Sequence, residues 1–223
     1  AIEAYQKALE IQPKLAIAYR NIAQILTQLN RQEEAVQYWY EALQLEPNWA
    51  TPEEYLTLGN MLLKQEKPLQ AIECYQRIIK VKPDSFEAAH NLGEAFSQLE
   101  RWLEAIDTYQ KALKINPNSA ITYQRLADAF VKVKSEDEAI INYKKAIEID
   151  PKSFQAHQKI AQLLFQQKQY EPALKAYLRA IELQPFYQWS YWNLWNILAE
   201  HHKLNDALTL YQDAVRRYPD APL

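Results

Sequence analysis

Glycine and the sulfur-containing residues are scarce in this sequence of 223 residues, which has 2 Gly, 1 Cys and 1 Met. The two glycines, Gly59 and Gly93, cannot form a glycine-rich phosphate loop or a dinucleotide-binding fingerprint, because both motifs need several glycines close together. The single cysteine, Cys74, excludes a disulfide framework, a CxxC redox pair and a thiolate zinc site. These shortages exclude nucleotide-cradling enzymes of those types, and they do not suggest an oxidised, secreted scaffold.

Clustered basic charge and long apolar runs are also missing. The formal net charge is -3, whereas nonspecific binding of a polyanion needs clustered Lys and Arg. No apolar run approaches the ~20 residues that span a bilayer, and residues 1–10 lack the layout of a signal peptide. We therefore expect no nucleic-acid partner, no membrane insertion and a cytoplasmic protein. Because the sequence starts in a helical pattern without Met, we interpret it as a fragment of a longer protein.

Prolines recur at a regular interval along the chain. Seven of the 11 prolines are separated by steps of 34, 36, 34, 34, 34 and 34 residues. These prolines are Pro13, Pro47, Pro83, Pro117, Pro151, Pro185 and Pro219. A period this regular indicates an array of internal repeats.

A helical stripe precedes each of these prolines. Every copy has Ala twelve residues before the proline, and every copy except the one with Ile78 has Ala five residues before it. Between them, eight residues before the proline, lies an aromatic: Tyr5, Trp39, Tyr75, Tyr109, Tyr143, Tyr177 and Tyr211. This spacing places all three side chains on one face of a helix.

An earlier helical stripe in each full copy is built on an aliphatic anchor. The anchors are Ile22, Leu58, Leu92, Leu126, Ile160 and Leu194. A small residue follows the first five anchors, namely Ala23, Gly59, Gly93, Ala127 and Ala161. Small side chains at this position let two helices approach closely, and the aromatic of the later helix fills the remaining gap. Each copy is therefore predicted to be a pair of packed helices.

The pattern resembles the tetratricopeptide repeat (TPR), a 34-residue pair of antiparallel helices. The resemblance implies an all-α fold, in which helix pairs stack into a right-handed α-solenoid, or superhelix, with a concave groove. It covers residues 1–223 as a single array. The expected parts are a half repeat at 1–13 and full repeats at 16–49, 52–85, 86–119, 120–153, 154–187 and 188–221.

The turns, one linker and the last copy depart from this family pattern. The family has Gly in the turn between the two helices, but the turn positions here are Asn30, Glu66, Glu100, Lys134, Lys168 and His202. Asn tolerates left-handed geometry, so each other turn is either rearranged or costs on the order of 1 kcal/mol. Ala50 and Thr51 lengthen one linker by two residues, which predicts a local change in superhelical pitch. The last copy has Trp195 at its small-residue position.

The linkers also contain candidate helix caps. Ser85, Ser119 and Ser153 each stand two residues after a repeat proline, where each can cap the next helix.

We find no catalytic or metal-binding constellation in the sequence. The histidines are His90, His157, His201 and His202, and none forms an HxxxH or HExxH pair. Adjacent residues of a helix do not face the same way, so His201 and His202 do not make a joint site. Cys74 is interpreted as a packing residue. We expect no enzymatic activity, cofactor or metal in this segment.

The resemblance implies that the first helix of each pair lines the groove, and amide side chains dominate its exposed positions. The candidate partner-binding residues are Asn21, Gln24, Asn60, Asn91, Gln124, Arg125, Lys159, Trp189, Trp192, Asn193 and Asn196. Asn and Gln offer both a donor and an acceptor, so a ladder of them suits the backbone of an extended peptide. The alternative is that these amides only solvate an exposed helix.

Two more specific comparisons within the family are incomplete. Asn60, Asn91 and Arg125 match the carboxylate clamp of chaperone-binding members, but Leu56 and Ile121 stand where that clamp has two Lys. Asn21, Asn91 and Asn193 resemble parts of the asparagine ladder in the repeat arms of O-linked sugar transferases, which Thr57, Arg125 and Lys159 interrupt.

The last copy is rich in aromatic residues between Phe186 and Trp195. Trp189 and Trp192 are three residues apart and should share a groove-facing side. Either this cluster is an interaction site, or it covers a further repeat or domain.

Two functions remain open from the sequence. The first is a scaffold or adaptor that binds a peptide or protein in the concave groove. The second is the substrate-recruiting arm of a larger enzyme, such as a glycosyltransferase, whose catalytic domain lies outside residues 1–223. We also expect self-association through an end of the array, because the face formed by Ala1, Tyr5 and Ala8 lacks a partner helix.

Overall fold

The computed structural model describes residues 1–185 and 188–200, together with residues 209 and 216. All regular secondary structure in this part of the chain is helical, so the expected all-α fold class is confirmed. The α-helices are α1 (Ile2–Ile11), α2 (Ala16–Gln28), α3 (Gln32–Leu45), α4 (Pro52–Lys64), α5 (Pro68–Val81), α6 (Phe86–Gln98), α7 (Trp102–Ile115), α8 (Ala120–Lys132), α9 (Glu136–Ile149), α10 (Phe154–Gln166), α11 (Tyr170–Leu183) and α12 (Gln188–Glu200). A short 3-10 helix, η1 (Pro47–Trp49), lies between α3 and α4. The expected turn at His202 and the aromatic Tyr211 lie outside the described residues, as do His201, Phe186 and Tyr187.

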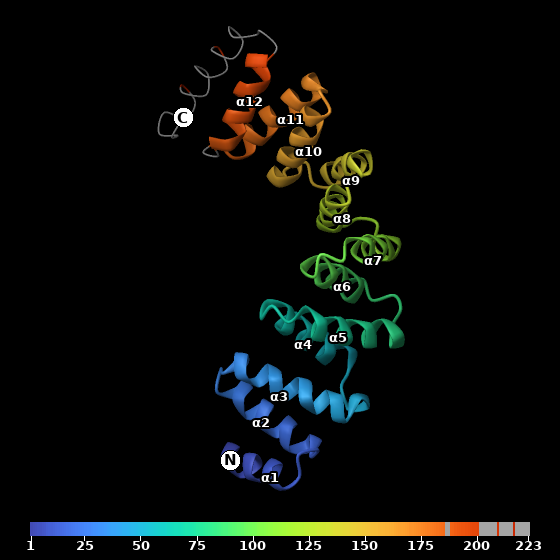
Figure 1. The fold of residues 1–223 in the computed structure, drawn as a ribbon, viewed down its shortest axis with the longest axis vertical. Helices are drawn as coiled ribbons and strands as arrows, with labels where there is room; N and C mark the ends of the chain where they lie inside the picture. The colour runs from blue at the N-terminus through green and yellow to red at the C-terminus, as the bar shows by residue number, and fades with distance from the viewer. Residues whose placement is uncertain (186–187, 201–208, 210–215, 217–223) are drawn as a thin grey trace. The chain divides into compact units, whose positions relative to one another are not determined.

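The chain forms two compact units, residues 1–116 and residues 117–223. The first unit contains α1 and the pairs α2/α3, α4/α5 and α6/α7, and the second contains the pairs α8/α9 and α10/α11 followed by α12. The two helices of each pair run antiparallel and are joined by a short turn (Figure 1). Within each unit, these pairs are the stacked repeats that the sequence predicts.

Close approach of the paired helices depends on the small residue after each anchor. A Cβ atom added at Gly59 would lie 2.7 Å from Cε1 of Tyr75, and one added at Gly93 would lie 2.5 Å from Cε1 of Tyr109. Neither ring could stay where it is beside such an atom. The predicted role of the small position is therefore confirmed. At the same position of α12, the side chain of Trp195 is 43% exposed.

The turns within the pairs adopt left-handed backbone geometry without glycine. Their φ angles lie between 57° and 61°, at Asn30, Glu66, Glu100, Lys134 and Lys168. The next residue closes each turn, as where the backbone N–H of Arg101 donates to the carbonyl oxygen of Phe96 at 2.9 Å. These described turns are therefore not rearranged. Instead, Glu66, Glu100, Lys134 and Lys168 adopt a backbone geometry that is unfavourable in free energy for residues other than Gly and Asn.

The first helix of several pairs has a side-chain cap at its N-terminus. Ser85, Ser119 and Ser153 each accept a hydrogen bond from a backbone N–H of the helix that follows, as predicted. In α4, Thr51 and Glu54 form a reciprocal capping box, which the sequence analysis did not identify. Caps of this kind satisfy backbone donors that have no partner inside the helix.

The linker between α3 and α4 differs from the other linkers. Six residues separate these helices, whereas four residues separate α5 from α6 and α9 from α10. The extra length contains η1 and ends at the Thr51 cap. The predicted insertion of Ala50 and Thr51 therefore takes the form of an added short helical turn.

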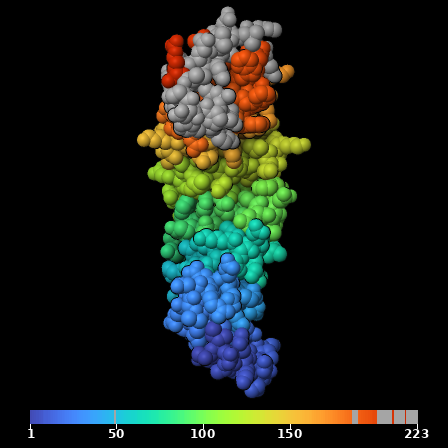
Figure 2. Space-filling view, turned by 90° about the vertical axis from the view of Figure 1, so that its left-hand side faces the viewer, coloured from blue at the N-terminus to red at the C-terminus, as the bar shows by residue number. Residues whose placement is uncertain are grey.

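Helix α1 packs on one side only. Ile2, Tyr5 and Leu9 contact the apolar cluster that includes Ile22 and Leu26. No residue of α1 is buried, and Tyr5 remains half-buried. In the space-filling view, α1 is the darkest blue surface beside α2 and α3 (Figure 2). Self-association through this surface stays a prediction.

Candidate functional site

The first helix of each pair carries two polar positions on its accessible side. One directly precedes the buried anchor and the other follows it by two residues, so the two are three apart and share a face. We call these positions the polar row. In the first unit it consists of Asn21, Gln24, Thr57, Asn60, Asn91 and Glu94, and in the second unit of Arg125, Asp128, Lys159, Gln162, Asn193 and Asn196. All of these side chains are exposed or half-buried.

In the first unit, the polar row is joined across neighbouring repeats by Asn60 and Asn91. The Nδ2 atom of Asn91 on α6 donates to Oδ1 of Asn60 on α4 at 2.7 Å. The hydroxyl of Tyr75, on α5, donates to the same oxygen at 2.8 Å. Two predicted site residues therefore lie together, and a buried tyrosine holds one of them in place.

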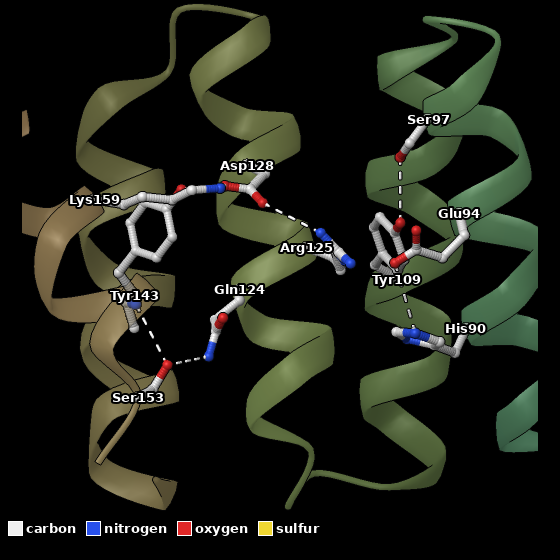
Figure 3. A network of polar contacts seen from close by, with 11 residues as sticks. His90, Glu94, Ser97, Tyr109, Gln124, Arg125, Asp128, Tyr143, Ser153 and Lys159 are labelled. Carbon is white, nitrogen blue, oxygen red and sulfur yellow. Dashed lines mark hydrogen bonds and ion pairs between the residues drawn. The ribbon is translucent and has the colours of Figure 1, made fainter. Parts of the chain in front are cut away.

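Aromatic side chains surround the last part of the polar row in the first unit. The ring of His90 stacks on Phe86 with centroids 6.0 Å apart, and it lies 5.8 Å from the ring of Tyr109. Its Nε2 atom is 3.8 Å from Oε1 of Glu94, and the Tyr109 hydroxyl forms a 3.2 Å hydrogen bond with Ser97 (Figure 3). His90 is therefore a packed side chain beside one carboxylate.

Asn21 and Gln24 occupy the polar row of α2. Asn21 is half-buried and Gln24 is exposed. Thr57, the next row residue, lies on α4 and donates to the backbone oxygen of Glu53 in its own helix at 2.9 Å. In this part of the described structure, the row thus lacks the inter-repeat bond that joins Asn60 to Asn91.

In the second unit, the polar row is organised around Asp128. The hydroxyl of Tyr143 and the ammonium group of Lys159 both donate to Oδ1 of this carboxylate. The guanidinium of Arg125 lies 3.9 Å from its other oxygen, Oδ2 (Figure 3). Gln124 turns aside to donate to the hydroxyl of Ser153 at 2.8 Å, so it links α8 to the cap of α10.

The tyrosine hydroxyls of these clusters stay protonated. Burial raises the pKa of Tyr75 and of Tyr143 well above that of a solvated phenol, and the carboxylate of Asp128 raises the pKa of Tyr143 further. Both hydroxyls are therefore hydrogen-bond donors at neutral pH, and they fix the orientation of the polar-row oxygen that each one contacts.

Helix α12 presents indole rings to solvent. Trp189 and Trp192 are 55% and 58% exposed, whereas Leu194 is buried. The side-chain amide of Asn193 donates to the backbone oxygen of Trp189 at 2.9 Å, and Asn196 is half-buried. That Trp189 and Trp192 share a groove-facing side stays a prediction.

Sequence reasoning missed the part played by the second helix. From the sequence, Tyr75 and Tyr143 are only gap-filling aromatics, and Asp128 is one more exposed position of a first helix. The available signal was the choice of Tyr at four successive described positions, because Phe would fill a gap equally well without a hydroxyl.

The described residues contain neither a metal-binding cluster nor a membrane-spanning helix. Among the described residues, no group of three or more His, Cys, Asp or Glu side chains could hold a metal ion. No helix in the described part of the chain is both long enough and apolar enough to cross a membrane.

Comparison with known proteins agrees with the helix-pair architecture. Models of the tetratricopeptide repeat match residues 4–37, 56–120 and 154–187, and a TPR repeat model matches residues 136–168. Small glutamine-rich tetratricopeptide repeat-containing protein 2 of Mycosarcoma maydis is 37% identical over 85 residues, which are 38% of this chain. The match spans 24% of that relative's length, about a quarter of it.

Solved structures show the same fold over most of the chain. The crystal structure of MamA has a TM-score of 0.67 and 26% identity, and the match covers 74% of this chain and 95% of that one. YrrB, described as a TPR protein with an unusual peptide-binding site, has a TM-score of 0.64 and 24% identity, with 85% and 97% coverage. Together with the paired helices and their 34-residue spacing, these matches show that the chain belongs to the tetratricopeptide-repeat family.

Proposed function

We propose that this chain is a protein-interaction module that binds an extended peptide of a partner protein along its first helices. In the first unit, the amides of Asn60 and Asn91 contact the peptide backbone. The hydrogen bond between these two side chains is the observation that carries the proposal, because it fixes which atom of each amide is left for a ligand.

The remaining atoms form a donor and an acceptor. Asn91 uses Nδ2 to reach Asn60, so its Oδ1 can accept from a peptide N–H. Asn60 uses Oδ1 twice, so its Nδ2 can donate to a peptide carbonyl. Side chains that are already ordered lose less entropy when a ligand binds. This arrangement favours recognition of a peptide backbone over recognition of one side-chain sequence.

The second unit offers a charged version of the same face. Lys159 and Arg125 are each 45% exposed, and both lie beside Asp128. An ammonium group has three donors, and Lys159 directs one of them to the carboxylate. The others can reach a peptide carbonyl or an acidic side chain, so we propose that these residues also bind peptide, within the second unit.

Capture of synthetic peptides tests the proposal. The immobilised chain is incubated with a library of random 12-residue peptides, and recovery is compared with that of a variant carrying both Asn60→Ala and Asn91→Ala. Losing two hydrogen bonds of about 1 kcal/mol each should reduce recovery at least about tenfold. Unchanged recovery would exclude the amide pair as a binding site.

Tyr75→Phe is the matched control for this experiment. It removes the internal hydrogen bond to Asn60 but leaves both amides on the accessible face. We expect this variant to retain capture, because Asn91 still donates to Asn60 and keeps both amides ordered. Thermal denaturation followed by circular dichroism shows whether each variant remains folded, so a general loss of structure is distinguished from a loss of binding groups.

A further inference from the structure

A pocket of about 440 Å³ opens in the first unit between the α2/α3 pair and α4. It lies where the α3–α4 linker is two residues longer than the other linkers. Its apolar wall is formed by Trp39 and Leu43 of α3 and by Leu58 and Met61 of α4. The longer linker holds the two repeats less closely together, which leaves this space beside the polar row.

The partial exposure of Trp39 distinguishes this helix pair from the later ones. Its counterparts Tyr75, Tyr109, Tyr143 and Tyr177 are at most 1% exposed, whereas Trp39 is half-buried. The indole Nε1 atom donates to Oγ1 of Thr27 at 3.3 Å, which sets the orientation of the ring. The aromatic that is enclosed in the other described helix pairs therefore presents part of its surface to this pocket in the α2/α3 pair.

The rim of the pocket is acidic and lies on the proposed peptide-binding side. Glu53, Glu54 and the polar-row residue Thr57 line the pocket and are exposed, which places them at its rim, and the described lining contains no Lys or Arg. Glu54 is held in place because its Oε2 atom accepts from the backbone N–H of Thr51 at 2.8 Å. An apolar cavity with carboxylates at its mouth is complementary to an apolar group that carries a neighbouring positive charge.

We propose that this pocket receives a large apolar side chain of a bound peptide, one that is next to a Lys or Arg in the peptide sequence. The inference rests on the proposed peptide-binding function and specifies its ligand. The apolar side chain contacts Trp39 and Met61, and the adjacent basic group lies near Glu53 and Glu54.

A short synthetic peptide tests this assignment. The ¹⁵N-labelled chain is titrated with a tetrapeptide of sequence glycine-tryptophan-lysine-glycine, acetylated at its N-terminus and amidated at its C-terminus. A second titration uses the same peptide with glutamate in place of lysine. The readout is the indole N–H resonance of Trp39, assigned with Trp39→Phe. We expect a saturable shift with the lysine peptide and affinity about fivefold weaker for the glutamate peptide. Equal affinities would overturn the charge preference, and absence of a shift would overturn the pocket.

Two further variants locate the binding. Thr57→Phe places a large ring at the mouth from an exposed position and should abolish the Trp39 shift. Glu53→Gln should weaken the lysine peptide about twofold, whereas Glu87→Gln, at the same position of α6 and away from the pocket, should not. Unchanged binding by Thr57→Phe and Glu53→Gln would refute the assignment.

The amide-pair variant separates this inference from the proposed function. Asn60 and Asn91 do not line the pocket, so Asn60→Ala with Asn91→Ala should still show the tetrapeptide shift while losing library peptides. If the tetrapeptide shift were lost in that variant but retained in Thr57→Phe, the ligand would bind at the amides. That result would refute the pocket assignment and leave the proposed function standing.

Discussion

Oδ1 of Asn60 accepts two hydrogen bonds, and the one from Asn91 comes from a residue 31 positions later in the chain. The other comes from Tyr75, so a single amide oxygen connects α4, α5 and α6. A side chain of the polar row thus takes part in holding two repeats together. The proposed function therefore couples binding to stability at this position, because a change at Asn60 would remove the proposed peptide contact and also leave a buried hydroxyl without its acceptor.

The tyrosine hydroxyls provide a direct test of that coupling. Tyr75→Phe removes a hydrogen bond inside the first unit and should lower the free energy of unfolding by about 1 kcal/mol. Tyr177 is the matched control, because its hydroxyl is buried without a hydrogen-bond partner in the described part of the chain. Tyr177→Phe should leave the stability unchanged or raise it slightly. Urea denaturation measures both, and equal losses would contradict the assigned role of Asn60.

Much of the fold could be predicted because equivalent residues make the same packing contacts in each repeat. The small residue after the anchor and the aromatic of the second helix face each other across one pair, so their sizes must match locally. Gly93 and Tyr109 illustrate this, since both positions were identified from spacing alone. The serine caps were predictable for the same reason, because a cap contacts only the next few residues.

The candidate site was less predictable because its bonds cross between repeats. Whether Asn91 reaches Asn60 depends on how one helix pair sits on the next, and this is not determined within a 34-residue period. The pocket beside Trp39 shows the same limit. The sequence shows the linker insertion, but the size and lining of the pocket depend on which side chains of α3 and α4 do not pack against each other.

The left-handed turns predict stabilising substitutions. Glu100 has φ of 57°, where any residue with a Cβ atom is strained. Glu100→Gly should raise the free energy of unfolding by about 0.5 to 1 kcal/mol. Asn30→Gly should give a smaller gain, because Asn tolerates this geometry better than Glu. A loss of stability in Glu100→Gly, measured by thermal denaturation, would show that the turn conformation is not under strain.

Gly93 should resist replacement even by alanine. The added Cβ atom would lie 2.5 Å from the Tyr109 ring, and overpacking of this kind costs about 1 to 3 kcal/mol. The higher helix propensity of Ala returns up to about 1 kcal/mol, so we expect a net loss of about 1 kcal/mol. Ala127 is the matched site in the second unit, and Ala127→Gly should also destabilise, because that pair is adapted to a methyl group. A stabilised Gly93→Ala variant would contradict the packing argument.

Cys74 offers a chemical probe of opening in the first unit. The side chain is 2% exposed, and burial raises the pKa of its thiol to about 12. A disulfide reagent at pH 8 should therefore react with it only after the surrounding helices open, since the thiolate is the reactive form. When reclosing is faster than labelling, the rate follows the equilibrium population of the open state. Tyr75→Phe, if it costs about 1 kcal/mol, should then label about fivefold faster, whereas Tyr177→Phe should label at the wild-type rate. Rapid labelling of the native wild-type chain would show that Cys74 is accessible without opening.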